Sequence, residues 1–172
     1  LYIQNGKVHS VCVDMGPAEL KPEKIPVQLA GREIVNHPVT IAGRDYHITC
    51  VSMGNPHCVV FEDNLDSVNL DEIGPAFEYS PLFPERVNVE FVTVIDQNTI
   101  KMRVWERGNG ETLAAGTSAC AGVVAAVRNG CCHQDQYILV KQKGGNLVVK
   151  CTDETVFMTG KPEAIFKGTV EI

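Results

Sequence analysis

The sequence predicts an α+β fold in which a strand-rich sheet or barrel wraps around one central buried helix. Most of the 172-residue chain is divided into short segments of strand character that end at glycine, proline or asparagine turns. One segment, from about Thr117 to Arg128, is nearly all small and apolar and lacks a polar face, so we expect that helix to be buried all round. Hydrophobic residues make up 44% of the chain, which is enough for a packed core in a domain of ordinary size.

The strand predictions rest on short apolar or alternating runs between turn signals. Asn5-Gly6 is the dipeptide typical of a two-residue hairpin turn, and Gly144-Gly145 marks another tight turn. Residues 17–38 are rich in proline and charge and are expected to form a connecting loop with one short strand at residues 25–29. The other expected strands, in chain order, cover residues 1–4, 7–13, 39–42, 46–52, 58–61, 87–94, 100–105, 137–141, 147–151, 155–159 and 164–172.

Two helices are expected. Apolar residues within residues 64–79 recur at close to helical spacing, and Pro81 and Pro84 end that segment. The second helix, which follows Gly116, ends at Asn129-Gly130, a typical C-terminal signal.

Composition excludes several classes of function. The net charge is −6 and the basic residues are scattered, so we expect no nucleic-acid partner. No apolar run is long enough to span a bilayer and Leu1 directly begins a strand-like pattern, so we expect neither membrane nor signal peptide. Seven cysteines without a CxxC pair indicate reduced thiols and a cytoplasmic protein. No metal-ligand spacing and no GxxxxGK loop occur, so no metal and no cofactor are expected.

The most informative run connects a predicted strand to the buried helix: Trp105-Glu-Arg-Gly-Asn-Gly-Glu-Thr-Leu-Ala-Ala-Gly-Thr-Ser-Ala-Cys-Ala121. A glycine-rich turn into a helix points backbone N–H groups and the positive end of the helix dipole at one spot, which suits a carboxylate or a phosphate. Glu106 and Arg107 add one negative and one positive charge to the same turn. The run therefore predicts a site for a small zwitterion, the alternative being a connection that needs glycine only for its bends.

This run resembles the second signature of the diaminopimelate epimerase family. Residues 52–58 (Ser-Met-Gly-Asn-Pro-His-Cys) and 84–91 (Pro-Glu-Arg-Val-Asn-Val-Glu-Phe) resemble two further motifs, in the family's order. The resemblance runs from Leu1 to Ile172 and covers the second half of a family member. It implies the diaminopimelate-epimerase fold and the cofactor-independent interconversion of LL- and meso-2,6-diaminopimelate in lysine and peptidoglycan precursor synthesis.

The resemblance also implies a domain organisation. Residues 1–15 would be end strands that belong to a missing N-terminal domain, residues 16–160 the C-terminal epimerase domain, and residues 161–172 a final strand that returns to the N-terminal domain. The partners it implies are a small-molecule substrate, that missing domain and a second copy of the chain in a homodimer.

In the family, one cysteine thiolate removes the α-proton and a second cysteine thiol protonates the opposite face. Ala115 stands where the family motif places the second cysteine, and the Cys-Gly-Asn-Gly motif of the first cysteine does not occur in this chain. The chain as written therefore has neither acid nor base, and Cys120, a helical turn further on, is expected to face elsewhere. Two explanations account for Ala115: an engineered Cys→Ala change, favoured by the otherwise intact motif, and natural drift, favoured by Ser118 where the family commonly has glycine.

Further roles follow from the resemblance. Gly116 and Thr117 would offer helix N-terminal N–H groups to the reacting α-carboxylate, with Thr117 as a simple helix cap being the alternative. Glu106 would bind the α-ammonium group and tune the neighbouring thiol. Arg107 would hold the distal carboxylate as a planar fork.

Two asparagines and a histidine complete the expected site. Asn55 and Asn88 would hydrogen-bond the distal end of the substrate and select its L configuration. His57 would approach the missing first cysteine and assist its proton transfer.

Three functions remain open at this stage. The first is a catalytically silent half of an epimerase, and the second is an amino-acid-binding module without turnover. The third is an isomerase of the same fold that uses a carboxylate as acid and base, against which the intact set of Asn55, Asn88 and Arg107 speaks.

Overall fold

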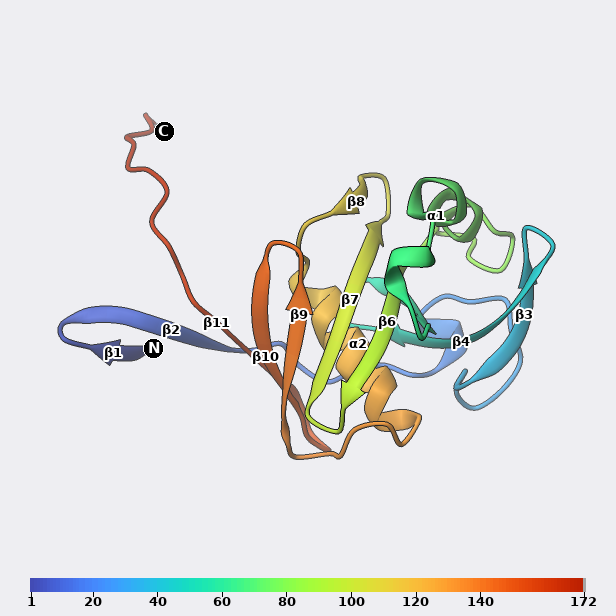
Figure 1. Cartoon of the computed structure of the whole chain (residues 1–172), viewed down its shortest axis with the longest axis horizontal. Helices are drawn as coiled ribbons and strands as arrows, with labels where there is room; N and C mark the ends of the chain where they lie inside the picture. The colour runs from blue at the N-terminus through green and yellow to red at the C-terminus, as the bar shows by residue number, and fades with distance from the viewer. Residues whose placement is uncertain (172) are drawn as a thin grey trace.

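The structure, a computed structural model, describes residues 1–171 and consists of one long curved sheet around a helix (Figure 1). The strands are β1 (Tyr2–Gln4), β2 (Lys7–Asp14), β3 (His37–Ile41), β4 (Arg44–Ser52), β5 (Pro56–Phe61), β6 (Asn88–Asp96), β7 (Thr99–Glu106), β8 (Gly110–Thr112), β9 (Tyr137–Gln142), β10 (Gly145–Cys151) and β11 (Val156–Gly160). The helices are α1 (Leu70–Glu78) and α2 (Gly116–Arg128), with short 3-10 turns η1 (Pro22–Lys24) and η2 (Leu65–Ser67). The strand order is β1-β2-β11-β10-β9-β7-β6-β5-β4-β3, and β8 pairs with β7.

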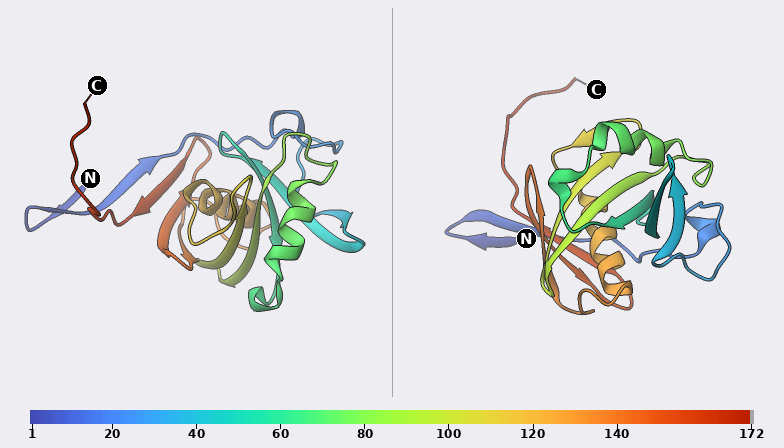
Figure 2. Two further views of the ribbon diagram at one scale, coloured as in Figure 1. Left: turned by 90° about the horizontal axis from the view of Figure 1, so that it is seen from above. Right: turned by 45° about the vertical axis from the view of Figure 1, so that its right-hand side comes forward.

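Helix α2 is the centre of this arrangement, as the sequence predicts. Every residue from Ser118 to Ala126 is buried. Strands β4, β5, β6, β7, β9, β10 and β11 all contact the helix, so the sheet curls around it (Figure 2). Because small side chains cover the whole surface of α2, strands can approach it from almost every direction.

The opposite face of strands β4 to β6 is covered by α1 and by residues 22–35. Side chains therefore alternate between two cores along β5: Val59 packs in the core around α2, whereas Cys58 and Val60 pack in the second core with Ile25 and Phe77. Burial on both faces explains why residues 58–61 of β5 are all apolar instead of alternating with polar residues. No helix among residues 1–171 has the length and apolar character needed to cross a bilayer.

Three local predictions within the body of the fold differ from the structure. Residues 25–29 form no strand, because the backbone N–H groups of Val27 and Gln28 bond to Pro22 and Leu82 instead of a neighbouring strand. The helix expected over residues 64–79 starts at Leu70, since the Asn64 side chain caps a separate 3-10 turn. Strand β8 is not predicted by the sequence; it returns along β7 after a turn at Gly108.

The two ends of the described chain extend away from the body (Figures 1 and 2). The β1–β2 hairpin forms as predicted, and only Val11–Asp14 of β2 pair with β11. Residues 161–171 form no strand and are exposed, whereas the sequence predicts a strand over residues 164–172. A strand requires a pairing partner, and none lies beside this segment within the described residues; Ile172 lies outside them.

Candidate active site

The candidate site lies at the edge of the sheet where α2 begins. Strands β5 and β6 run parallel, with His57 in register with Asn88, so both strands start at this edge. Strand β7 runs antiparallel to β6 and therefore ends there, with Trp105 opposite Val89. The sheet topology thus brings together the three sequence motifs, which are far apart along the chain.

One hydrogen-bonded relay leads from the interior to the start of α2. The buried Glu90 carboxylate lies 2.7 Å from His57 Nδ1, and His57 Nε2 lies 3.0 Å from Asn55 Oδ1. Asn55 Nδ2 in turn donates to Thr117 Oγ1 at 3.3 Å. In this arrangement Asn55 Oδ1 accepts from His57 Nε2–H, which leaves the Thr117 hydroxyl hydrogen free for a ligand.

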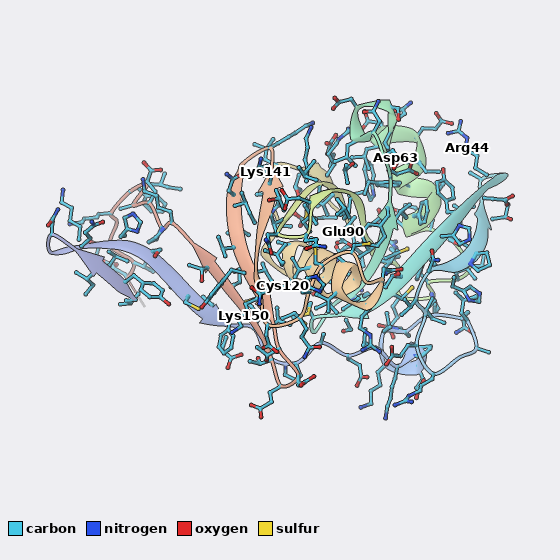
Figure 3. All side chains as sticks on the ribbon, turned by 60° about the horizontal axis from the view of Figure 1, so that its bottom comes forward. Arg44, Asp63, Glu90, Cys120, Lys141 and Lys150 are labelled. Atoms are coloured by element: carbon cyan, nitrogen blue, oxygen red, sulfur yellow. The ribbon has the colours of Figure 1, made fainter. Side chains whose placement is uncertain are left out.

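His57 lies behind Asn55 rather than at the surface. Its side chain is fully buried, and both ring nitrogens have partners. Figure 3 shows Glu90 in the interior beside the central helix, whereas Arg44 lies at the periphery. The geometry therefore places His57 as a support for Asn55.

Burial raises the pKa of Glu90, while the neighbouring His57 and the Ser118 hydroxyl oppose that shift. Glu90 Oε2 has no hydrogen-bond partner of ordinary geometry among the described residues. A buried carboxylate with one unpaired oxygen lowers the stability of the fold. The contact of its other oxygen with His57 therefore points to a role in holding His57.

Asn88 connects two parts of the site. Its Nδ2 donates to the Pro56 carbonyl at 3.0 Å, and its Oδ1 accepts from the Arg107 backbone N–H at 2.9 Å. The turn before β5 and the turn after β7 are therefore fixed to each other by one amide. One N–H of Asn88 remains for a ligand.

Arg107 and Glu106 occupy the turn at the end of β7. The Arg107 side chain is exposed, and its Nη1 donates to the Glu85 carbonyl at 2.9 Å. No other acceptor within residues 1–171 binds this guanidinium, so N–H groups are left to bind a carboxylate. Glu106 is half-buried and accepts a hydrogen bond from the Thr112 hydroxyl across the β7–β8 hairpin.

The N-terminus of α2 is open. Ala115 is the N-cap residue, and no side chain caps the helix, so its first N–H groups have no intrahelical partner. Thr117 is the second residue of the helix rather than its cap. An open hollow of about 610 Å³ lies over Ala115 and Gly116 and is also lined by Lys161, whose charge complements an anion.

Gln142 of β9 holds the backbone at this point. Its Oε1 accepts from the Ala115 N–H at 2.8 Å, and its Nε2 lies 3.5 Å from the Ala115 carbonyl. The position of the residue-115 side chain is thus fixed by a neighbouring strand. A methyl group stands there, so this position supplies no proton donor or acceptor.

Cys120 does not replace the missing thiol. The residue is fully buried on α2, and burial raises its pKa to about 12. A thiol with that pKa is protonated at neutral pH and does not act as a base.

Sequence reasoning missed two residues of the site. Glu90 has a signal in the sequence, because it is a charged residue in an apolar strand, two positions after Asn88 and so on the same face. Gln142 has none, since its partner is a backbone amide 27 residues away. No cluster of three or more residues suited to a metal ion occurs among residues 1–171.

Solved structures share this fold at low sequence identity. A hydroxyproline epimerase from Agrobacterium vitis matches with a TM-score of 0.62 and 10% identity over 92% of this chain and 51% of that one. A probable proline racemase from Agrobacterium radiobacter matches with a TM-score of 0.66 and 11% identity over 92% of this chain and 52% of that one. The fold is therefore the one found in these racemase and epimerase structures.

Sequence comparison gives the family. The family model for diaminopimelate epimerase matches residues 49–165. The chain is 49% identical to the diaminopimelate epimerase of Acetivibrio thermocellus, with 100% of this chain and 61% of that protein covered. It is 46% identical to the diaminopimelate epimerase of Methanococcus maripaludis, with 99% of this chain and 61% of that protein covered. The chain belongs to the diaminopimelate epimerase family, and it spans about 60% of the length of these curated relatives.

Proposed function

We propose that this chain is the C-terminal part of a diaminopimelate epimerase and carries half of a two-cysteine active site. One observation carries the proposal: Asn55 bonds to Thr117, and Asn88 bonds to both the Pro56 carbonyl and the Arg107 backbone N–H. Four separate segments of the chain therefore meet around the open end of α2. Such an end attracts a carboxylate, and the Arg107 fork suits a second one. A dicarboxylic amino acid matches this pair of anion sites.

In the proposed reaction, a thiolate on one face of the substrate takes the α-proton while a thiol on the other face gives up its proton to the same carbon. The electron pair of the broken C–H bond moves into the α-carboxylate during the step. The N–H groups of Gly116 and Thr117 would stabilise that developing charge, because the hydrogen bonds that they donate become stronger as the negative charge grows. Glu106 would pair with the α-ammonium group and keep the substrate oriented.

His57 is proposed as a positioning residue. Its burial and its contacts to Glu90 and Asn55 support a role in orienting the Asn55 amide. The expectation from the family resemblance, that His57 assists proton transfer at the first cysteine, stays a prediction.

A second function is favoured by Ala115. With a methyl group at this position and the rest of the site assembled, the protein would bind the amino acid without turnover. A same-fold isomerase that uses a carboxylate as acid and base has less support, because the set of Asn55, Asn88 and Arg107 suits a dicarboxylic amino acid.

The test uses the full-length protein, once as it stands and once with Ala115→Cys. Each form is incubated with LL-diaminopimelate in D₂O, and loss of the α-proton signal is followed by NMR. Exchange only after Ala115→Cys supports the two-thiol epimerase. Binding without exchange in both forms supports the silent binding module, and absence of binding contradicts both functions.

A further inference from the structure

Glu78, at the C-terminal end of α1, is a buried carboxylate that lies outside all three family motifs. Its residue is 2% exposed. Oε2 accepts from the Trp105 indole N–H at 2.7 Å, and Oε1 accepts from the Gly108 backbone N–H at 2.9 Å. The carboxylate therefore holds the chain by hydrogen bonds on both sides of Glu106 and Arg107.

Helix α1 packs closely against the Trp105 side chain. Gly74 packs directly on the indole, where an added Cβ would lie 2.3 Å from Trp105 Cδ2. The ring is thus held on its face by Gly74 and at its nitrogen by Glu78. Helix α1 consequently fixes the end of β7, and with it the start of the turn that carries the candidate ligand-binding residues.

The same carboxylate also anchors the loop that holds the Arg107 side chain. Arg86 Nη1 lies 3.6 Å from Glu78 Oε1, and the preceding residue, Glu85, accepts from Arg107 Nη1 at 2.9 Å through its carbonyl. Both the backbone and the guanidinium of Arg107 are therefore linked to Glu78 through neighbouring residues of the chain.

We propose that Glu78 is a positioning residue that fixes the Arg107 guanidinium and so sets the affinity for the distal carboxylate of the ligand. The inference rests on the proposed function, in which Arg107 binds that carboxylate. Only an acceptor fits at Glu78, because Trp105 Nε1–H and Gly108 N–H are both obligate donors. An amide at this position would place an N–H group against one of them.

The experiment is a double-mutant cycle in the full-length protein, with ligand affinity measured by NMR titration. Glu78→Gln is expected to weaken binding of LL-diaminopimelate about tenfold, which corresponds to loss of one hydrogen bond to a charged group. Binding of L-lysine, which lacks the distal carboxylate, is expected to weaken much less. In an Arg107→Ala background, Glu78→Gln is expected to cause no further loss, because the two residues act on the same contact.

Glu72→Gln is the matched control, since Glu72 lies on the same helix but is exposed, with its nearest cation, the exposed Arg44, 3.8 Å away. Should Glu78→Gln not fold, Trp105→Phe removes one of the two donors and carries the same expectation. Unchanged diaminopimelate binding in the variant, an equal loss for lysine, or an additive loss with Arg107→Ala each overturns the inference. Failure of the unmodified protein to bind diaminopimelate contradicts the proposed function instead, so the two failures are distinct.

Discussion

At position 115 a single side chain decides whether the site has a proton carrier. Cys120 cannot serve, because burial raises its pKa to about 12. Cys132 lies beyond the other end of α2, and burial raises its pKa to about 11. A thiol at position 115 would sit at the N-cap of α2, where the helix dipole favours the thiolate.

Ala115→Cys should therefore introduce the most reactive thiol of the protein. At pH 7 we expect iodoacetamide to label the new cysteine at least about tenfold faster than any native one, since reaction rate follows the thiolate fraction. Mass spectrometry of timed digests measures this difference. Serine at the same position is the control, and labelling of the introduced thiol no faster than that of the fastest native cysteine would contradict an open, electropositive helix end.

The buried Glu90–His57 pair makes stability depend on pH, because a buried charge without its partner lowers the stability of the fold. Burial raises the pKa of Glu90 above its ordinary 4.5, and His57 opposes that rise. A carboxyl whose pKa is higher in the folded state binds protons more tightly when folded, so it reduces stability as pH rises above 4.5.

His57→Leu removes the opposing group and should increase that effect. We expect the substitution to lower the free energy of unfolding by about 3–5 kcal/mol at pH 7.5, and by less at pH 5, where Glu90 is more readily protonated. Urea denaturation at the two pH values gives the comparison. His47→Leu, at an exposed histidine of β4, is the control, and a pH-independent loss at His57 would show that the Glu90 charge is not the cause.

At the scale of elements, glycine is required in one helix and replaceable in the other. Gly74 in α1 is required by contact with Trp105, whereas a Cβ at Gly122 in α2 would meet Ile100 at 3.5 Å, an ordinary van der Waals distance. Neither glycine has the positive φ that favours glycine, so the neighbouring side chains alone decide the effect of substitution.

Alanine at these two positions should change stability in opposite directions. Gly74→Ala is expected to lower the free energy of unfolding by about 1–3 kcal/mol, because the Trp105 ring must move. Gly122→Ala is expected to raise it by up to about 1 kcal/mol through helix propensity. Denaturant titration of both variants checks the pair, and a neutral Gly74→Ala would mean that α1 does not fix Trp105.

At the scale of the whole molecule, the sequence predicts those features that depend on residues close together along the chain. The apolar surface of α2 predicts its central place, and Asn5-Gly6 predicts its hairpin, because each signal is local. Strand β8 could not be predicted, since Gly108 and Gly110 look equally suited to a loop that leads into a helix.

The site shows the same division. The motif residues could be named from the sequence, but the contacts that hold them could not, because the partners are distant along the chain. Glu90 lies 33 residues from His57, and Glu78 lies 27 from Trp105. Only the register of β5, β6 and β7 and the docking of α1 bring these pairs together.

The exposed ends of the chain lead to the last prediction. Ile165 and Phe166 are 91% and 86% exposed, and Ile3 of the β1–β2 hairpin is 66% exposed. Apolar side chains and an open strand edge of this kind normally pack against another surface. We propose that an N-terminal domain covers them in the full-length protein, in line with the expectation for residues 1–15 and 161–172.

The isolated 172-residue chain should then self-associate as its concentration rises, because another copy offers the same apolar surface and edge. Light scattering coupled to size exclusion measures the mass across a concentration series from micromolar to millimolar. Ile165→Asp with Phe166→Asp should shift the chain towards monomer, whereas Ile95→Asp, at an exposed apolar residue of β6 in the body, should not. If the unmodified chain stays monomeric across this range, these ends need no cover, and the assignment of residues 1–15 and 161–172 to another domain loses its physical support.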